Sequence, residues 1–231
     1  MMPTTSNDPC LWVPAYLSDL LMPGEVVQTY VDRNDVALWR AHSGKVNAWS
    51  NRCPHRGMRL SHGFVRGDML ACIYHGWHYG SDGGCKYIPA HPDLEPPSTI
   101  CTDGFECIEQ DGLIWISPES SADKPDALPT RHAVRSMTFW VSKQFLTDAL
   151  VKYGSSYLAM GGSSAIILGT FGVSLTLADR TKLTIAVQEI SPQETFLHVL
   201  SDVSLSAEKK TGISRNLDRL RERIESEDQA Q

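Results

Sequence analysis

Short runs of apolar residues separated by polar turns fill the first half of the chain. The runs lie at residues 26–31, 36–41 and 46–50, and Asp, Asn or Gly stands in each segment between them. This alternation predicts strands joined by turns. Further along, Asp111-Gly112 joins two more apolar runs, and Asp-Gly is a strong signal for a tight hairpin. The first half is therefore expected to be all β.

The second half begins after residues 117–130, a stretch with several prolines that is typical of a linker. Apolar and polar residues then alternate at 173–177, 183–188 and 195–200. Alternation of this kind predicts half-buried antiparallel strands. The second half is therefore expected to contain an antiparallel sheet.

A helix is predicted over residues 213–227, because apolar residues recur along one of its faces. They are Ile213, Leu217, Leu220 and Ile224. We interpret this face as packing on the sheet. The arginines of the same segment form a solvated face or, alternatively, a docking site for an acidic partner; they are Arg215, Arg219, Arg221 and Arg223. The expected fold class is mainly β or α+β, an all-β domain followed by a partial antiparallel sheet and a C-terminal helix.

Length and charge limit the organisation and the partners of the chain. Its 231 residues have room for two small domains, and we divide it into a domain at 10–118, a linker at 119–135 and a second domain at 136–231. The net charge of −6, without a basic stripe, argues against nucleic-acid binding. The apolar stretch 165–168 is too short to cross a bilayer, and residues 1–9 lack the apolar centre of a signal peptide. We therefore expect no membrane partner and a cytoplasmic location.

Two short motifs carry the chemistry of the first half. Cys53-Pro54-His55 and Cys72-Ile73-Tyr74-His75 read C-x-H and C-x-x-H, with sixteen residues between them. Thiolates suit iron–sulfur clusters, and imidazole suits iron. Two thiolates and two imidazoles are able to hold a [2Fe-2S] cluster with Cys on one iron and His on the other. The candidate metal ligands are therefore Cys53, His55, Cys72 and His75.

The residues around the four candidate ligands support a cluster. Pro54 stiffens the first turn, and Gly57, Gly76 and Gly80 allow the backbone to approach closely. Trp77 is placed to shield the cluster from water. A structural zinc site is the alternative, but its usual pairs are C-x-x-C and H-x-x-x-H, and the mixed pairs found here fit it poorly.

In full, the two motifs read Asn51-Arg52-Cys53-Pro54-His55-Arg56-Gly57 and Cys72-Ile73-Tyr74-His75-Gly76-Trp77-His78-Tyr79. They resemble the Rieske domain of the non-heme iron ring-hydroxylating oxygenases, and most closely the vanillate O-demethylase and phthalate dioxygenase branch of alpha subunits. The resemblance runs from about Leu11 to Pro118. It includes residues 83–85 and 88–89, which are similar to the family's Pro-containing loop that closes over the cluster.

The remaining cysteines are Cys10, Cys85, Cys101 and Cys107. Respiratory Rieske proteins have an extra Cys in each ligand loop, and its absence here matches the oxygenase type. In a reducing cytosol we expect free thiols. A disulfide between Cys101 and Cys107 is the alternative.

The second half departs from the family. There, the resemblance implies a mononuclear iron held by two His and one carboxylate, from an Asp-x-x-His-x-x-x-x-His motif and a later Asp. None of the eight histidines here is five residues from another. An alternative triad of His132, His198 and Asp202 stays open. Asp148 is the nearest candidate for the family's bridging Asp, but no histidines follow it.

By resemblance, residues 136–231 correspond to a truncated helix-grip catalytic domain. The segment that brings the iron is absent, and the chain stops before the family's usual terminal region. A mononuclear Fe(II) in this chain is therefore doubtful, and whether the protein is an enzyme on its own stays open. Family members hydroxylate aromatic rings or remove O- or N-methyl groups, and they form trimers in which the cluster of one chain serves the next.

Three hypotheses for function follow. The first is an electron-transfer component between a flavin or ferredoxin reductase and a partner oxygenase subunit, with His55 or His75 at the exit. Trp77 and Tyr79 are candidates to line that exit surface, with core packing as the alternative. The second hypothesis is a complete oxygenase in aromatic catabolism with a cryptic or shared iron site. The third is a non-catalytic remnant or a redox sensor.

Overall fold

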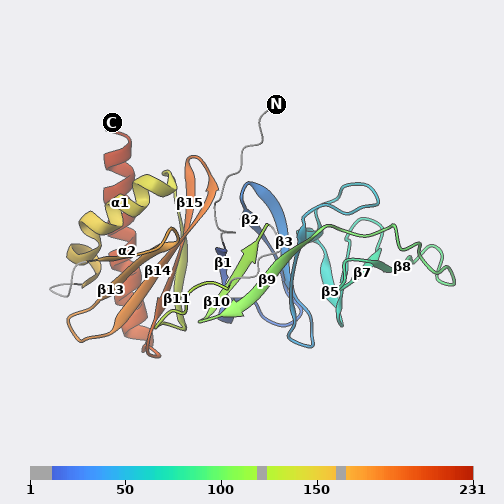
Figure 1. Ribbon diagram of the computed structural model, residues 1–231, viewed down its shortest axis with the longest axis horizontal. Coiled ribbons are helices and arrows are strands. Elements are labelled where there is room, and N and C mark those ends of the chain that lie inside the picture. Colours follow the sequence, from blue (N-terminus) through green and yellow to red (C-terminus); the bar gives the residue numbers. More distant parts are fainter. Residues whose placement is uncertain (1–11, 119–123, 160–164, 231) are drawn as a thin grey trace.

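The computed structural model describes residues 12–118, 124–159 and 165–230. Three antiparallel sheets succeed one another along its length, with the smallest at one end and two helices at the other (Figure 1). The six-stranded sheet contains β1 (Val13–Leu17), β10 (Leu113–Ser117), β9 (Gly104–Gln110), β4 (Val46–Ser50), β3 (Asn34–Arg40) and β2 (Val26–Val31), in that order. The four-stranded sheet contains β5 (Phe64–Arg66), β6 (Met69–Ala71), β7 (His78–Gly80) and β8 (Cys85–Tyr87).

The expected strands of the first half are present in the six-stranded sheet. The turn between β9 and β10 has positive φ at Asp111 and Gly112, 54° and 80°, as a tight hairpin requires. β1 was not predicted from the sequence. It pairs with β10, and Tyr16 follows a shift in its register. Such a shift breaks the two-residue period by which an isolated strand is recognised.

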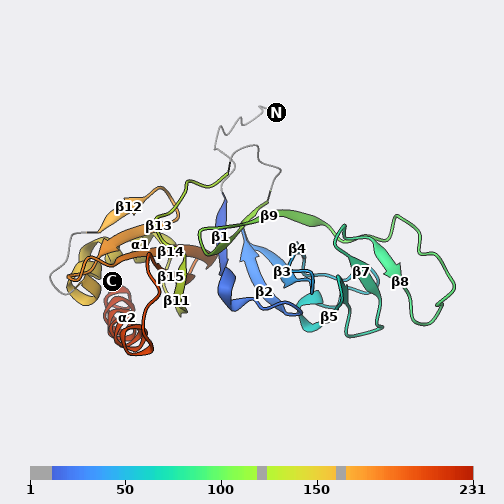
Figure 2. The ribbon, with the colours of Figure 1, turned by 90° about the horizontal axis from the view of Figure 1, so that it is seen from below.

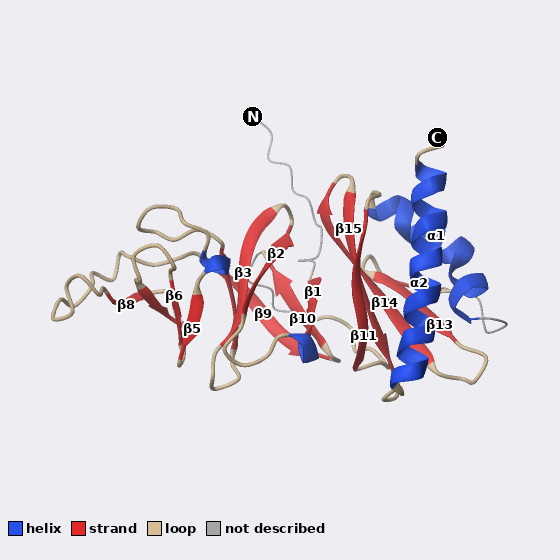
Figure 3. Ribbon diagram, turned by 180° about the vertical axis from the view of Figure 1, so that it is seen from behind, coloured by secondary structure: helices blue, strands red, loops and turns tan. Residues whose placement is uncertain are grey.

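The five-stranded sheet of the second half contains β11 (His132–Phe139), β15 (Glu194–Ser201), β14 (Lys182–Ser191), β13 (Gly172–Thr176) and β12 (Ile166–Leu168), in that order. The helices α1 (Lys143–Gly154) and α2 (Ala207–Asp228) cover its outer face (Figure 3). Leu197 and Val199 point to these helices, while Leu200 contributes to the core shared with the first half. The expected fold class, mainly β with a C-terminal helix, is confirmed.

Two boundaries in the second half differ from the expectation. β11 begins at His132, inside the expected linker 119–135, because its residues pair in register with β15 from Ser201 onward. α2 begins at Ala207, where the Ser206 side chain accepts a hydrogen bond from Lys209 N. The polar first turn of this helix hid its beginning from the apolar pattern. The four apolar residues predicted to pack on the sheet are all buried.

Helix α1 was missed. Its N-cap is Ser142, whose side chain accepts a hydrogen bond from Phe145 N at 3.3 Å. Leu146, Ala149 and Leu150 are buried against the sheet. Asp148, considered as the bridging acid, lies on this helix, where its carboxylate accepts from the Gln144 side chain. A π-helical segment, η3 (Ser155–Ala159), follows α1 directly.

The two halves share a core and a polar network. Figure 2 shows β1 of the first half lying next to the five-stranded sheet of the second. Trp115 from β10 and Leu200 from β15 belong to the same buried cluster. Beside them, Gln188 Nε2 donates to Thr29 Oγ1 at 2.9 Å and to the carbonyl oxygen of Tyr30 at 2.6 Å. Gln188 lies on β14 and the other two residues lie on β2. A buried side chain of the five-stranded sheet therefore completes hydrogen bonds of the six-stranded sheet.

Candidate metal centre

The first ligand loop is a tight turn closed by two backbone hydrogen bonds. Cys53 N donates to the carbonyl oxygen of Met58 at 2.8 Å, and Gly57 N donates to the carbonyl oxygen of Cys53 at 2.8 Å. Gly57 has φ of +74°, which residues with a Cβ rarely adopt. The loop therefore needs glycine at this position to bring Cys53 and His55 to the same end of the domain.

The second ligand loop repeats this geometry. Cys72 N donates to the carbonyl oxygen of Trp77 at 2.9 Å, and Gly76 N donates to that of Cys72 at 2.9 Å. Gly76 has φ of +69°, and a Cβ built on it would lie 3.0 Å from Cγ of Pro89. The Pro-containing loop thus lies against this turn. The spacing of Cys to His differs between the loops, but their backbones match.

The sulfur side of the site is buried. Cys53 and Cys72 belong to one core cluster with Tyr79, and all three are almost fully enclosed. The Tyr79 hydroxyl lies 3.1 Å from Cys53 Sγ. Burial, and then the interaction with Cys53, raises the pKa of Tyr79, so its hydroxyl stays protonated and able to donate to a thiolate. Burial also raises the pKa of the Cys72 thiol.

The imidazole side is open to solvent. His55 is half-buried and stacks on Trp77 with ring centroids 4.1 Å apart and planes 5° apart. His75 is exposed, and its ring centroid lies 4.7 Å from that of His55. Burial lowers the pKa of His55, as do the neighbouring charges of His75 and Arg56. The neutral imidazole, which is the form that binds metals, is therefore favoured.

An orphaned atom marks the space between the loops. Nδ1 of His55 is buried and has no hydrogen-bond partner within the described residues. A buried polar atom without a partner costs free energy, and metal coordination is a way to satisfy it. Two enclosed thiols, a hydroxyl donor beside one of them and an orphaned imidazole nitrogen fit a group bound by sulfur inside and nitrogen outside. The donor set is that of a mixed Cys/His [2Fe-2S] cluster.

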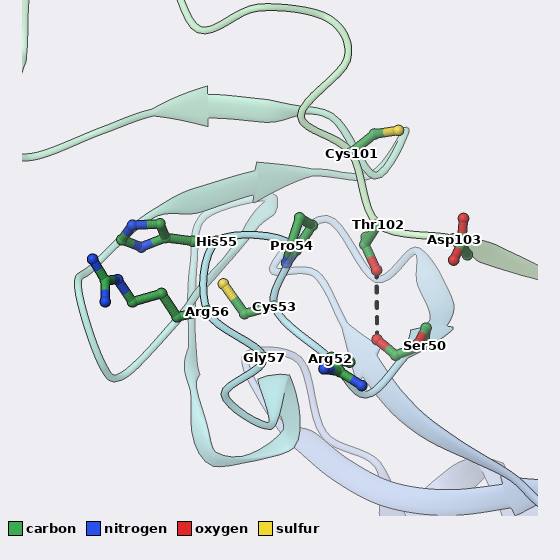
Figure 4. Close-up of a pocket in the computed structure, with 10 residues that line it drawn as sticks. All are labelled: Ser50, Arg52, Cys53, Pro54, His55, Arg56, Gly57, Cys101, Thr102 and Asp103. Carbon is green, nitrogen blue, oxygen red and sulfur yellow. Dashed lines mark hydrogen bonds between the residues drawn. The ribbon is translucent and has the colours of Figure 1, made fainter.

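A cavity of about 490 Å³ opens beside the first ligand loop (Figure 4). His55, Arg52 and Arg56 line it together with the exposed Cys101. Figure 4 shows the Arg56 side chain extending on the same side of the loop as the His55 imidazole. At the other end of the cavity, Thr102 Oγ1 donates to the carbonyl oxygen of Ser50, at 3.4 Å. The ligand loop is therefore flanked by open space and by cationic side chains.

Trp77 and Tyr79, the two candidates for the exit surface, differ in exposure. Trp77 is half-buried and covers the His55 ring. Tyr79 was a candidate for the exit surface with core packing as the alternative, and core packing is confirmed, because the residue lies on β7 and is fully buried in the core cluster. Its contact with Cys53 was missed by sequence reasoning. The signal available was a large aromatic residue on the strand that directly follows the second ligand loop.

Three of the other cysteines lie within the described residues. Cys85 is buried, Cys101 is exposed and Cys107 is partly exposed, and each is unpaired. The alternative disulfide between Cys101 and Cys107 is therefore wrong for this structure. Cys10 lies outside the described residues.

His132, His198 and Asp202 do not come together as a triad. His198 Nδ1 lies 2.7 Å from Ser136 Oγ, and Nε2 lies 3.1 Å from Gln188 Oε1. Both ring nitrogens are thus engaged by protein groups. Asp202 Oδ1 accepts from Lys182 N at 2.9 Å. Across residues 12–118, 124–159 and 165–230, no three His, Cys, Asp or Glu side chains converge on a single metal ion.

Sequence comparisons with known proteins concern mainly the first half of the chain. Residues 11–98 match the Rieske [2Fe-2S] domain. The oxidoreductase NdmD of Pseudomonas putida is 44% identical over 107 residues, which are 46% of this chain and 18% of NdmD. The methylxanthine N1-demethylase NdmA of the same species is 46% identical over 76 residues, 33% of this chain and 22% of NdmA. The matched segments thus span about a fifth of these relatives.

Solved structures show a fold like that of the whole chain. A variant of NdmA with theobromine superimposes with a TM-score of 0.72 at 18% identity, covering 94% of this chain and 81% of NdmA. Apo dicamba monooxygenase gives 0.67 at 17% identity, covering 94% of this chain and 85% of the other. At this identity the likeness concerns the fold alone.

No helix in the described parts of the chain is long and apolar enough to cross a membrane. The matched domain supports a [2Fe-2S] cluster, and the relatives support a role in electron transfer or oxygenation. Residues 11–98 are therefore a Rieske [2Fe-2S] domain, and the chain is a relative of the Rieske oxygenase components.

Proposed function

We propose that this protein is an electron-transfer component that binds its [2Fe-2S] cluster through Cys53, His55, Cys72 and His75. The observation that carries the proposal is the polarity of the site, with both thiols enclosed and an imidazole edge exposed at His75. When bound, the cluster supplies one-electron redox chemistry. Cys53 and Cys72 would hold the cluster on its buried side, and His55 and His75 would hold it on the exposed side.

The chain's own residues have distinct tasks around the cluster. Tyr79 donates a hydrogen bond to the Cys53 sulfur, which stabilises the reduced state by offsetting negative charge. Trp77 stacks on His55 and keeps water from that ring face. His75 leaves its outer edge free for a partner. Electrons therefore pass through the imidazole side.

The partners we propose are a flavin or ferredoxin reductase as the source and a mononuclear iron oxygenase site as the acceptor. Two relatives support these partners: NdmD, an oxidoreductase, supports the reductase, and NdmA, a demethylase, supports the oxygenase. The acceptor belongs to a separate oxygenase subunit or to the next chain of a homo-trimer. Residues 10–118 act as the cluster domain, 119–131 as its linker and 132–231, which begin with β11, as a second domain without its own iron, and we place the protein in the cytoplasm.

Anaerobic purification with metal and sulfide analysis tests this function. We expect two irons and two sulfides per chain, as a [2Fe-2S] cluster requires, and rapid single-electron reduction by a reductase encoded beside this chain. A protein without iron, or a cluster that no reductase reduces, contradicts the proposal. A cluster that no reductase reduces would favour a non-catalytic remnant. A change in partner binding that depends on the redox state of the cluster would favour a redox sensor.

A complete oxygenase is the second candidate. The likeness to oxygenase structures extends over 94% of this chain, and so includes the second half. This function needs a cryptic iron site or one shared with another chain. Clearly more than two irons per chain, together with oxygen consumption on an aromatic or N-methylated substrate, would support it over the carrier.

A further inference from the structure

The tip of the second ligand loop has little packing to fix it. Ile73 and Tyr74 are 56% and 57% exposed, and the candidate ligand His75 beside them is exposed as well. A segment with few buried contacts opens locally unless hydrogen bonds restrain it. The orientation of His75 therefore depends on the hydrogen bonds of the residues next to it.

Gly76, the residue after His75, is restrained at both of its backbone polar groups. Its N–H donates to the carbonyl oxygen of Cys72 at 2.9 Å. Its carbonyl oxygen lies 2.6 Å from Nδ1 of the His78 side chain. Because a carbonyl oxygen only accepts, Nδ1 of His78 carries the proton and donates. The His78 ring thus holds the backbone directly beside the exposed ligand.

His78 is itself held in place by the four-stranded sheet. It is the first residue of β7, is half-buried, and pairs with Tyr87 of β8. The two rings meet edge to face, with centroids 5.3 Å apart and planes 78° apart, which is a favourable aromatic geometry. A side chain fixed by its strand and by a neighbouring ring is able to restrain the loop that precedes it.

The first ligand loop has a different residue at the corresponding position. Arg59 lies two residues after Gly57. His78 has the same place after Gly76 in the second loop. The Arg59 side chain lies 3.3 Å from Asp35, outside the loop. The two turns therefore share their backbone hydrogen bonds, whereas the histidine contact belongs to the second turn.

We propose that His78 is a positioning residue for the cluster: its Nδ1–H holds the Gly76 carbonyl oxygen and so fixes the orientation of His75. The inference rests on the proposed function, because it assigns His78 a role toward the cluster that this function requires. Groups that orient metal ligands are worth about 10- to 100-fold in metal affinity. Without the N–H, His75 leaves its binding orientation more often and the cluster is lost more easily.

Packing of the His78 ring on Tyr87 is the competing explanation. Three substitutions separate the ring from its donor. His78→Phe keeps an aromatic ring without the N–H. His78→Asn loses the ring but places an amide N–H where Nδ1 lies, and His78→Leu has nearly the shape of asparagine without any donor.

Loss of iron to a ferrous chelator, followed as bleaching of the cluster absorbance, tests this role. We expect His78→Phe and His78→Leu to lose the cluster about tenfold faster than wild type, and His78→Asn to stay within about twofold of it. The lines of the reduced cluster in paramagnetic resonance should broaden in the Phe and Leu variants only, because His75 then adopts several orientations.

His91→Phe is the matched control. This histidine is exposed in the same domain, and its backbone N–H, rather than its ring, bonds the carbonyl oxygen of Ile88. The variant should lose iron at the wild-type rate. Circular dichroism of every variant verifies that it is folded.

The outcomes separate this inference from the proposed function. A folded His78→Leu protein that assembles no cluster, beside a His78→Asn protein that assembles one, also supports the positioning role. If His78→Phe keeps the cluster as well as wild type, or His78→Asn loses it as fast as His78→Leu, the positioning role is wrong while the proposed function stands. A wild type that holds no cluster overturns both.

Discussion

The histidines at the two ends of the molecule differ in whether their ring nitrogens have hydrogen-bond partners. In the ligand loops, His55 has a buried ring nitrogen without a partner, and His75 is exposed. In the second sheet, His198 is fully buried, and both of its nitrogens are bonded, to Ser136 and Gln188. The unpartnered nitrogen of His55 is available to a bound group. His198 is complete without any further group.

This difference separates a binding histidine from a structural one. A ligand needs a free nitrogen lone pair aimed at a shared space. Both ring nitrogens of His198 take part in a hydrogen-bond network, which continues through Gln188 to Thr29 and Tyr30 of the first half. Its role is therefore to hold the two halves together, and substitutions are able to separate that role from cluster binding.

The largest effect is expected from loss of a cluster ligand. Cys72→Ser should abolish the cluster, because a hydroxyl is a poor ligand for iron–sulfur centres. The iron content should fall to near zero. Cys107→Ser is the matched control: this cysteine is partly exposed, burial raises the pKa of its thiol to about 11, and it lies outside the ligand loops. If Cys107→Ser loses the iron and Cys72→Ser keeps it, the assignment of ligands is wrong.

The reverse pattern is expected for His198→Leu. Gln188 Oε1 would be left buried without its donor, and the free energy of unfolding should fall by about 3–4 kcal/mol. Urea unfolding followed by tryptophan fluorescence measures this. The absorbance of the folded protein's cluster should be unchanged. A variant of wild-type stability, or one that loses iron while folded, would break the distinction between the two histidine classes.

A slightly smaller effect is expected from pH. Burial lowers the pKa of His198 to about 4 in the folded protein, against about 6.5 in an unfolded chain. Between these values the unfolded chain binds a proton that the folded one does not. Stability is therefore unaffected above about pH 6.5 and falls on acidification toward pH 4, by roughly 3 kcal/mol.

His198→Gln isolates this pH dependence, because glutamine hydrogen-bonds without titrating. The difference in unfolding free energy between wild type and variant should change steadily from pH 6.5 to 4. A difference that stays constant over this interval would show that His198 is not buried in its neutral form.

The smallest effect concerns the hydrogen bond to the Cys53 sulfur. Tyr79→Phe keeps the ring in the core and removes the hydroxyl that lies 3.1 Å from the sulfur. The reduction potential should fall by about 40 mV, equivalent to about 1 kcal/mol for one electron. Protein-film voltammetry measures it, with Tyr74→Phe, altered on the exposed loop, as the control. An unchanged potential in Tyr79→Phe would show that this hydroxyl does not donate to the sulfur.

Sequence reasoning was strongest where local pattern decides structure. The strands around Asp111-Gly112 follow from turn chemistry and alternation, and the structure confirms them. The spacing of Cys53, His55, Cys72 and His75 indicated a paired set of loops because each motif is short and local. Their matching backbone hydrogen bonds are visible only in three dimensions.

Sequence reasoning was weakest where segments that are far apart along the chain meet in space. Nothing near Gln188 in the sequence signals that it completes hydrogen bonds on a strand about 160 residues earlier. For Tyr79 the sequence left the exit surface and core packing open, because its separation from Cys53 along the chain hides the contact between the two side chains. Helix α1 carried a readable signal, an N-cap at Ser142 before Leu146 and Leu150, which strand alternation around it obscured.

Paramagnetic resonance of the dithionite-reduced protein, combined with iron analysis, distinguishes a mixed Cys/His cluster from every other metal site. We expect two irons per chain and the spectrum of a mixed Cys/His [2Fe-2S] cluster, retained in His198→Gln and absent in Cys72→Ser. A single zinc, an all-cysteine spectrum, or a cluster that survives loss of Cys72 would contradict it.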